Sequence, residues 1–127
     1  MKVEVSNGEL IDKVTILELK LLNIIDVEKL VNIQKEFDGL NPLLEDLFTN
    51  YSPDIQNHYL ELANLNAQLW KIEDDIRECE KNNEFGGKFV ELARSVYITN
   101  DKRCEVKKII NVITESGFIE EKSYKNY

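Results

Sequence analysis

Hydrophobic residues recur along most of the chain at spacings of three and four, which is the period of an α-helix rather than of a strand. The clearest run lies near the N-terminus, where one helical face would carry Leu10, Val14, Leu17, Leu21 and Ile24. Ser6 followed by Glu9 matches the S-x-x-E capping box that opens many helices. We therefore expect a first helix over residues 7–25.

The next stretch carries the signals of two short helices. Asp26 can cap a helix over Val27–Asp38, and Gly39 would stop it. Asn41-Pro42 then predicts a second short helix, through about Phe48, because proline is favoured at the first helical position. The two would form a shorter helix pair.

Two long helices follow. Ser52-Pro53 repeats the proline signal and predicts a helix over residues 53–82. The segment Asn82–Gly87 is rich in turn residues, and the last long helix is expected over residues 87–116. Gly117 would be its stop.

Strand signal is confined to the ends of the chain. Lys2–Val5 alternates between polar and apolar residues, and Phe118–Tyr124 could pair with it as a small β-ribbon. Such an isolated ribbon is marginal in water. The expected fold class is therefore all-α: a helical bundle of three long helices plus a shorter helix pair, in one domain over residues 1–127.

Charge and cysteine usage narrow the class of function. The net charge of −8 argues against nucleic-acid binding and against docking on anionic membranes. There is no apolar stretch long enough to span a membrane, and no apolar signal core at the N-terminus. Cys79 and Cys104 have no metal-site spacing, and His58 is the single histidine. We expect reduced thiols, a cytoplasmic location, and neither nucleic acid nor membrane among the partners.

Several polar residues fall inside the apolar stripes of the predicted helices. On a helical wheel, Glu73 and Glu80 share the sector of the apolar residues around Leu62, and Arg103 lies near the middle of the last helix's apolar face. Burying a charge is costly unless it is paired. Such residues form a candidate inward binding cluster: Glu18, Glu73, Glu80, Asn100 and Arg103. Antiparallel packing of the two long helices would also bring Asn66 level with Arg103.

Three interpretations of this cluster remain open. It can be a buried polar network that fixes helix register. It can also be a set of exposed charges at the edge of a flat dimer interface between helices. It can also be a site in which Glu18, Glu73 and Glu80 hold Mg²⁺ or Mn²⁺ while Arg103 faces an anion, because carboxylates in helical bundles bind hard cations.

Long blocks of the chain resemble a family of small, uncharacterised bacterial proteins that is known only as a domain of unknown function. The opening Glu4–Glu18, E-V-S-N-G-E-L-I-D-K-V-T-I-L-E, is similar to the start of that family. Four further blocks resemble it: Trp70–Arg77, Phe89–Tyr97, Thr99–Arg103 and Glu120–Tyr124. The resemblance implies membership and brings no activity with it.

The opening block also presents polar residues at the start of the first helix. These form a second candidate site, a helix edge made of Asn7, Glu9, Asp12 and Lys13. The N-terminus of a helix favours anionic groups because its amide groups are free and its dipole is positive there.

Two classes of function are compatible with these observations. The first is a non-enzymatic interaction module without a cofactor, expected to form a homodimer and to bind a protein partner, because long amphipathic helices in a small chain leave apolar surface uncovered. The alternative is a metal-dependent all-α phosphohydrolase or small-anion-binding protein that uses the inward carboxylates and Arg103 with Mg²⁺ or Mn²⁺.

Overall fold

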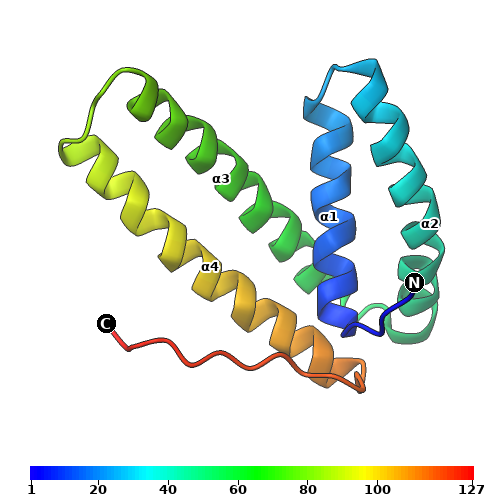
Figure 1. Cartoon of the computed structure of the whole chain (residues 1–127). Coiled ribbons are helices and arrows are strands. Elements are labelled where there is room, and N and C mark those ends of the chain that lie inside the picture. The colour runs from blue at the N-terminus through cyan, green and yellow to red at the C-terminus, as the bar shows by residue number, and fades with distance from the viewer.

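The computed structural model describes residues 1–127 and consists of four helices without any strand (Figure 1). The helices are α1 (Asn7–Asn23), α2 (Val27–Tyr51), α3 (Gln56–Lys81) and α4 (Gly87–Ile113). The all-α prediction is therefore confirmed. None of the helices is both long and apolar enough to cross a membrane.

The predicted terminal β-ribbon is wrong. Neither segment forms a strand, and from the neighbouring residues Asn7 and Ser116 the two segments run to opposite sides of the molecule (Figure 1). The C-terminal segment runs back along α4 and is held there by side chains, with Lys107 next to Glu120 (3.3 Å) and Lys108 next to Glu121 (3.0 Å).

The predicted short helix pair is a single helix, α2. Gly39 and Pro42 both lie inside it, and Asn41 donates to Glu45 (3.1 Å) instead of capping a new helix. The reason is that the apolar stripe continues without a break through these positions, as Ile33, Phe37, Leu40, Leu44 and Leu47. Packing of that stripe outweighs the local preference of glycine and proline to end a helix.

The start of α1 and the ends of α3 and α4 follow local backbone chemistry. As predicted, the Ser6 hydroxyl accepts a hydrogen bond from the Glu9 amide (3.2 Å). Helix α3 begins at Gln56, after the cis Ser52-Pro53 bond, rather than at Pro53. The ends of α3 and α4 are closed by Asn83 and Glu115, which both have positive φ.

Glu115 rather than Gly117 reverses the chain after α4. The Ser116 amide donates to the Asn111 carbonyl oxygen (2.9 Å), and Glu115 has a φ of 51°. This is the pattern of a Schellman motif, in which glycine usually occupies the left-handed position. A side chain at that position is strained because its Cβ crowds the backbone.

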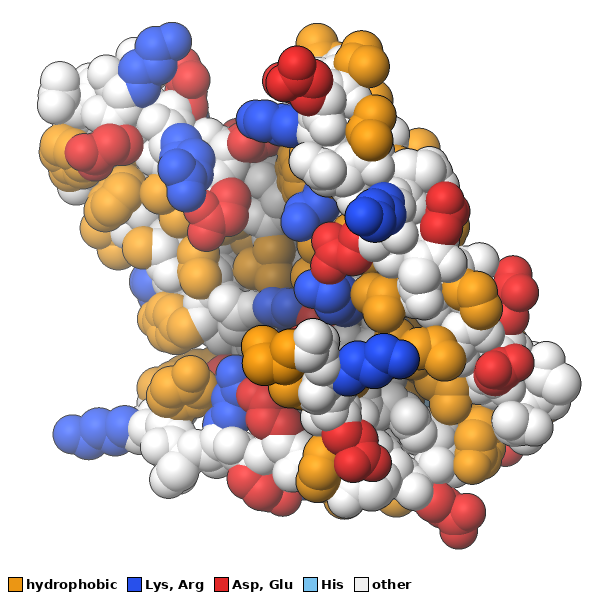
Figure 2. All heavy atoms as spheres, turned by 45° about the vertical axis from the view of Figure 1, so that its right-hand side comes forward, with side chains coloured by type: hydrophobic (Ala, Val, Ile, Leu, Met, Phe, Trp, Pro, Cys, Tyr) orange, Lys and Arg blue, Asp and Glu red, His pale blue; other side chains and the backbone are white.

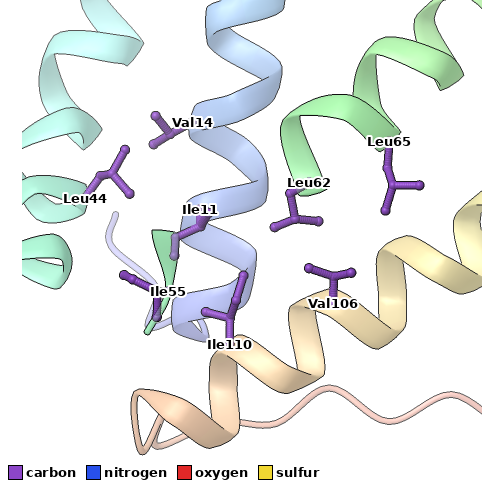
Figure 3. Close-up of a cluster of buried hydrophobic side chains, with 8 residues drawn as sticks. All are labelled: Ile11, Val14, Leu44, Ile55, Leu62, Leu65, Val106 and Ile110. Atoms are coloured by element: carbon purple, nitrogen blue, oxygen red, sulfur yellow. The ribbon is translucent and has the colours of Figure 1, made fainter. Parts of the chain in front are cut away.

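The hydrophobic core lies at one end of the bundle and draws on all four helices and the α2–α3 connection (Figure 3). Its buried members are Ile11, Val14, Leu44, Ile55, Leu62, Leu65, Val106 and Ile110. Helix α1 is central, because it packs against each of the other three helices, and α3 packs against α4. Burying each of these side chains contributes about 1.5–3 kcal/mol.

Beyond the core the helices separate into two arms, one of α1 and α2 and one of α3 and α4 (Figure 1). No residue of the core cluster comes from α3 after Leu65 or from α4 before Val106. The outer halves of α3 and α4 therefore pack mainly on each other. A side chain that points away from that contact meets solvent rather than a third helix.

Replacing Glu115 with glycine is expected to raise the free energy of unfolding by about 1 kcal/mol, because glycine adopts positive φ without a Cβ clash. Chemical denaturation measures the change. Glu115→Ala removes the same charge but keeps a Cβ, and it should give no such gain. An equal gain from alanine would show that charge, not backbone strain, is responsible.

Candidate functional site

Asp12 is the centre of a polar network that joins three helices. Its side chain, on α1, is 1% exposed. Arg103 of α4 donates to both carboxylate oxygens, from Nε to Oδ1 (2.8 Å) and from Nη2 to Oδ2 (2.5 Å). Asn66 of α3 donates to Oδ1 (2.9 Å). A two-pronged guanidinium–carboxylate pair is the geometry in which a buried charge is best compensated.

The remaining hydrogen bonds of this network also stay within the protein. The Thr15 hydroxyl donates to the Asp12 carbonyl oxygen (2.7 Å) and accepts from Asn66 (2.9 Å). Arg103 Nη1 donates to the Asn100 amide oxygen (3.3 Å). No buried side-chain nitrogen or oxygen lacks a hydrogen-bond partner. The network is therefore complete without a ligand.

Two cations of α4 keep their charge in this environment. The hydrogen bonds to Asp12 raise the pKa of Arg103, although burial of the guanidinium opposes them. Burial alone would lower the pKa of Lys107, but the hydrogen bond to Glu9 and the nearby carboxylates reverse this and raise it. Lys107 contacts Glu9 of α1 at 2.7 Å. Two ion pairs, spaced one helical turn apart on α4, thus bind α4 to α1.

A second set of contacts joins the first turn of α1 to the C-terminal end of α4. The Gly8 amide donates to the Asn111 side-chain oxygen (2.6 Å), and the Asn7 amide donates to the Ser116 hydroxyl (3.1 Å). The Asn7 side chain donates to the Thr114 hydroxyl (2.9 Å). The free amide groups at this helix start are therefore satisfied from within the chain.

The predicted helix edge is mostly an internal contact. Asn7, Glu9 and Asp12 all bind residues of α4 or of the turn that follows it. Lys13 is exposed and pairs with Glu36 of α2 (2.9 Å). Of the four side chains, Lys13 (54% exposed) is the most accessible to solvent, and Glu9 is 41% exposed while it pairs with Lys107.

The predicted inward cluster is not assembled. Arg103 and Asn100 lie together in the polar network, but Glu18 accepts from the Tyr59 hydroxyl at 2.6 and 2.7 Å on another side of α1. Burial and the Glu18 carboxylate raise the pKa of the Tyr59 phenol, which therefore remains protonated. These residues belong to two separate contacts.

The prediction that Glu73 and Glu80 point inward is wrong. Both are exposed, and Glu73 pairs with Arg77 one turn along α3 (3.5 Å). They lie on the outer half of α3, where no helix other than α4 covers the surface. No group of three or more histidine, cysteine, aspartate or glutamate side chains lies close enough to hold a metal ion, so Glu18, Glu73 and Glu80 are not gathered as a metal site.

The central role of Asp12 was missed by reasoning from the apolar stripe alone. Four buried residues of α1 follow one another at spacings of three, one and three: Gly8, Ile11, Asp12 and Thr15. They form a second stripe on α1, beside the one that faces α2. Its small and polar residues are the sequence signal that could have identified α1 as the central helix.

Replacing Asp12 with asparagine is expected to lower the free energy of unfolding by about 2–4 kcal/mol, because it leaves the Arg103 guanidinium without its counter-charge. Urea denaturation gives the value. Glu73→Gln, which removes an exposed carboxylate of the same kind of pair, should change stability by less than about 0.5 kcal/mol. Similar effects at both positions would contradict the structural role of Asp12.

Gly8 allows α1 and α4 to approach closely. A Cβ built at this position would lie 2.5 Å from the Lys107 carbonyl oxygen. Gly8→Ala should therefore destabilise the protein by about 2 kcal/mol, since backbone must shift. Gly39→Ala is the matched control: nothing lies near its Cβ, so thermal melts should show a gain of up to about 1 kcal/mol from helix propensity. A neutral Gly8→Ala would contradict the close contact.

Comparison with known proteins assigns the chain to a family rather than to an activity. Neither a curated protein nor a solved structure matches it significantly. The sequence pattern of a family of unknown function (DUF6165) matches residues 1–127, the whole chain. The protein therefore belongs to this family of unknown function.

Proposed function

We propose that the protein is a non-enzymatic interaction module that self-associates as a homodimer through the free end of the α1–α2 arm. We call this surface the α1–α2 tip, made of Leu22, Ile25, Val27 and Val31. The exposed fractions of these side chains run from 64% at Val31 to 91% at Ile25. This concentration of exposed aliphatic side chains is the observation that carries the proposal.

Single exposed apolar residues are ordinary on protein surfaces, whereas a cluster favours an interface. Leu22 lies in the last turn of α1, Ile25 in the connection, and Val27 and Val31 one turn apart at the start of α2, so all four are at the same end of the arm. Figure 2 shows hydrophobic side chains at the upper end of this arm. Covering such a side chain contributes about 1.5–3 kcal/mol to association.

The polar residues support a structural role more than a catalytic one. Both carboxylate oxygens of Asp12 are taken by Arg103 and Asn66, and the Glu18 carboxylate is taken by Tyr59. These groups hold helices in place. Their use supports the interpretation of the inward charges as a network that fixes the bundle.

The second arm offers a surface for a protein partner. At its free end Phe85 and Phe89 pack edge to face, with ring centres 5.4 Å apart, and Val90 is half exposed next to them. Aromatic side chains are favoured anchors at protein interfaces. The two free thiols, Cys79 and Cys104, support a reducing compartment, and we propose a cytoplasmic location on that ground.

Ile25→Lys is expected to weaken dimerisation by about tenfold or more, because a lysine ammonium would be desolvated in the contact. Analytical ultracentrifugation over a concentration series measures it. Val3→Lys is the matched control, since Val3 is 76% exposed in the N-terminal segment away from the tip.

At a concentration where the wild type is monomeric, both variants should keep its melting curve, because both side chains are exposed in the single chain. A wild-type protein that stays monomeric throughout the series would overturn the proposal. So would an Ile25→Lys variant that dimerises as the wild type does.

A further inference from the structure

The C-terminal segment, residues 117–127, runs back along α4 and away from the α1–α2 arm (Figure 1). Two adjacent acidic residues near its start each contact a lysine of α4: Glu120 lies 3.3 Å from Lys107, and Glu121 lies 3.0 Å from Lys108. The two lysines differ in exposure, because the Lys108 side chain is 50% exposed and that of Lys107 is 12% exposed. The first ion pair is therefore better shielded from water than the second.

Lys107 is shared between the C-terminal segment and α1. Its ammonium group contacts Glu9 of α1 at 2.7 Å as well as Glu120, so it lies between carboxylates of two different elements. Within the segment, Lys122 also contacts Glu120 (3.5 Å). The positive charge of Lys107 lowers the pKa of Glu120, although slight burial opposes this, and Glu120 is therefore ionised at neutral pH. The charge of Glu120 thus acts directly on the ion pair that joins α4 to α1.

The other end of the segment is attached by its last residue. The Tyr127 hydroxyl donates to Asp101 (2.5 Å), and its ring packs edge to face on Tyr97, with ring centres 5.3 Å apart. On α4, Asp101, Cys104 and Lys108 follow one another at spacings of three and four and so share one face of the helix. The segment contacts the first and the last of these three residues. It therefore passes over Cys104, which is partly buried.

Little else attaches the segment to the helices. Its backbone forms no hydrogen bond with theirs, and none of its residues belongs to the buried core. No atom lies within 4 Å of a Cβ position at Gly117, where the segment leaves the turn after α4. Partly exposed ion pairs and one aromatic contact stabilise little, and segments held in this way open locally while the rest of a protein stays folded. The segment can therefore leave α4 without breaking the core.

We propose that the C-terminal segment is a strap with a closed and an open position. In the closed position, Glu120 shields Lys107 from water and keeps it against Glu9, and an ion pair shielded from water is stronger than a solvated one. In the open position this pair is solvated, while the Asp12 network stays intact. Because α1 and α4 belong to different arms, the strap sets how firmly the two arms are joined. It works within a single chain and does not rest on self-association.

The first experiment compares the two adjacent carboxylates in the full-length chain. Glu120→Gln should raise the equilibrium constant for unfolding about three- to fivefold, at the upper end of the range for accessible ion pairs. Glu121→Gln is the matched control, because it removes the same charge from a lysine that pairs with no residue of α1, and it should change the constant by less than about twofold. Urea denaturation at low protein concentration measures both. Equal effects of the two variants would overturn the proposal.

A Lys107→Met background shows whether Glu120 acts through Lys107. Methionine keeps an unbranched side chain but has no charge. In this background Glu120→Gln should no longer change the unfolding equilibrium, because no ammonium group remains between the segment and α1. An effect that persists at its full size would show that Glu120 acts through another contact, such as the one with Lys122, and would contradict the strap.

The second experiment measures opening through the rate at which iodoacetamide, an uncharged reagent, alkylates Cys104. Cys79 is 1% exposed, and a Cys104→Ser variant gives its background rate. Tyr127→Ala removes the contacts at the far end of the strap and should raise the rate at Cys104 severalfold, with an unchanged circular dichroism spectrum. Tyr124→Ala, the control, removes an exposed ring that lies over Lys122 of the segment itself and should leave the rate unchanged. Equal rates in Tyr127→Ala and the wild type would rule out a strap that opens.

Discussion

The structure depends on one buried carboxylate. Asp12 lies on the central helix, almost without exposure to solvent, and it is tolerated there because Arg103 and Asn66 supply donors from two other helices. Apolar contacts are not directional, so the hydrophobic cluster of Figure 3 allows the helices to slide or rotate more easily than the polar contacts do. Hydrogen bonds with fixed donors and acceptors permit one register, and we infer that Asp12 sets how α3 and α4 cross α1.

The same arrangement explains why so much apolar surface is exposed. Helix α1 forms the shared contact at one end of the bundle, and beyond it the two helix pairs diverge. Each outer half of a helix has one neighbour rather than two. In a bundle whose helices pack along their full length, the apolar faces of these helices would be buried. Here they are exposed at the free ends of the two arms. Figure 2 shows the surface hollowed between the arms. This open shape is the support for the interaction module that we propose.

Sequence reasoning was most accurate where local chemistry decides the outcome. The capping pair of Ser6 and Glu9 located the start of α1, and Asp26 located the start of α2. It failed where local and tertiary preferences disagree. Gly39 and Pro42 predict a break, but the apolar stripe on either side of them packs on α1 as one surface. In contrast, the sequence correctly predicted that Asn66 and Arg103 lie at the same height along α3 and α4, because the turn between two antiparallel helices sets which residues face each other. Both side chains donate to Asp12 Oδ1.

The amino-acid sequence by itself determined that the chain is helical, where most helices begin, and which face of each is apolar, because these properties depend on neighbours three and four positions away. Only the tertiary structure decided which polar residues are buried. A helical wheel gives the direction of a side chain about its own axis, but not whether another helix lies in that direction at that height. Glu73 shares the wheel sector of core residues and is solvated, whereas Asp12 lies beside them and is enclosed by two other helices.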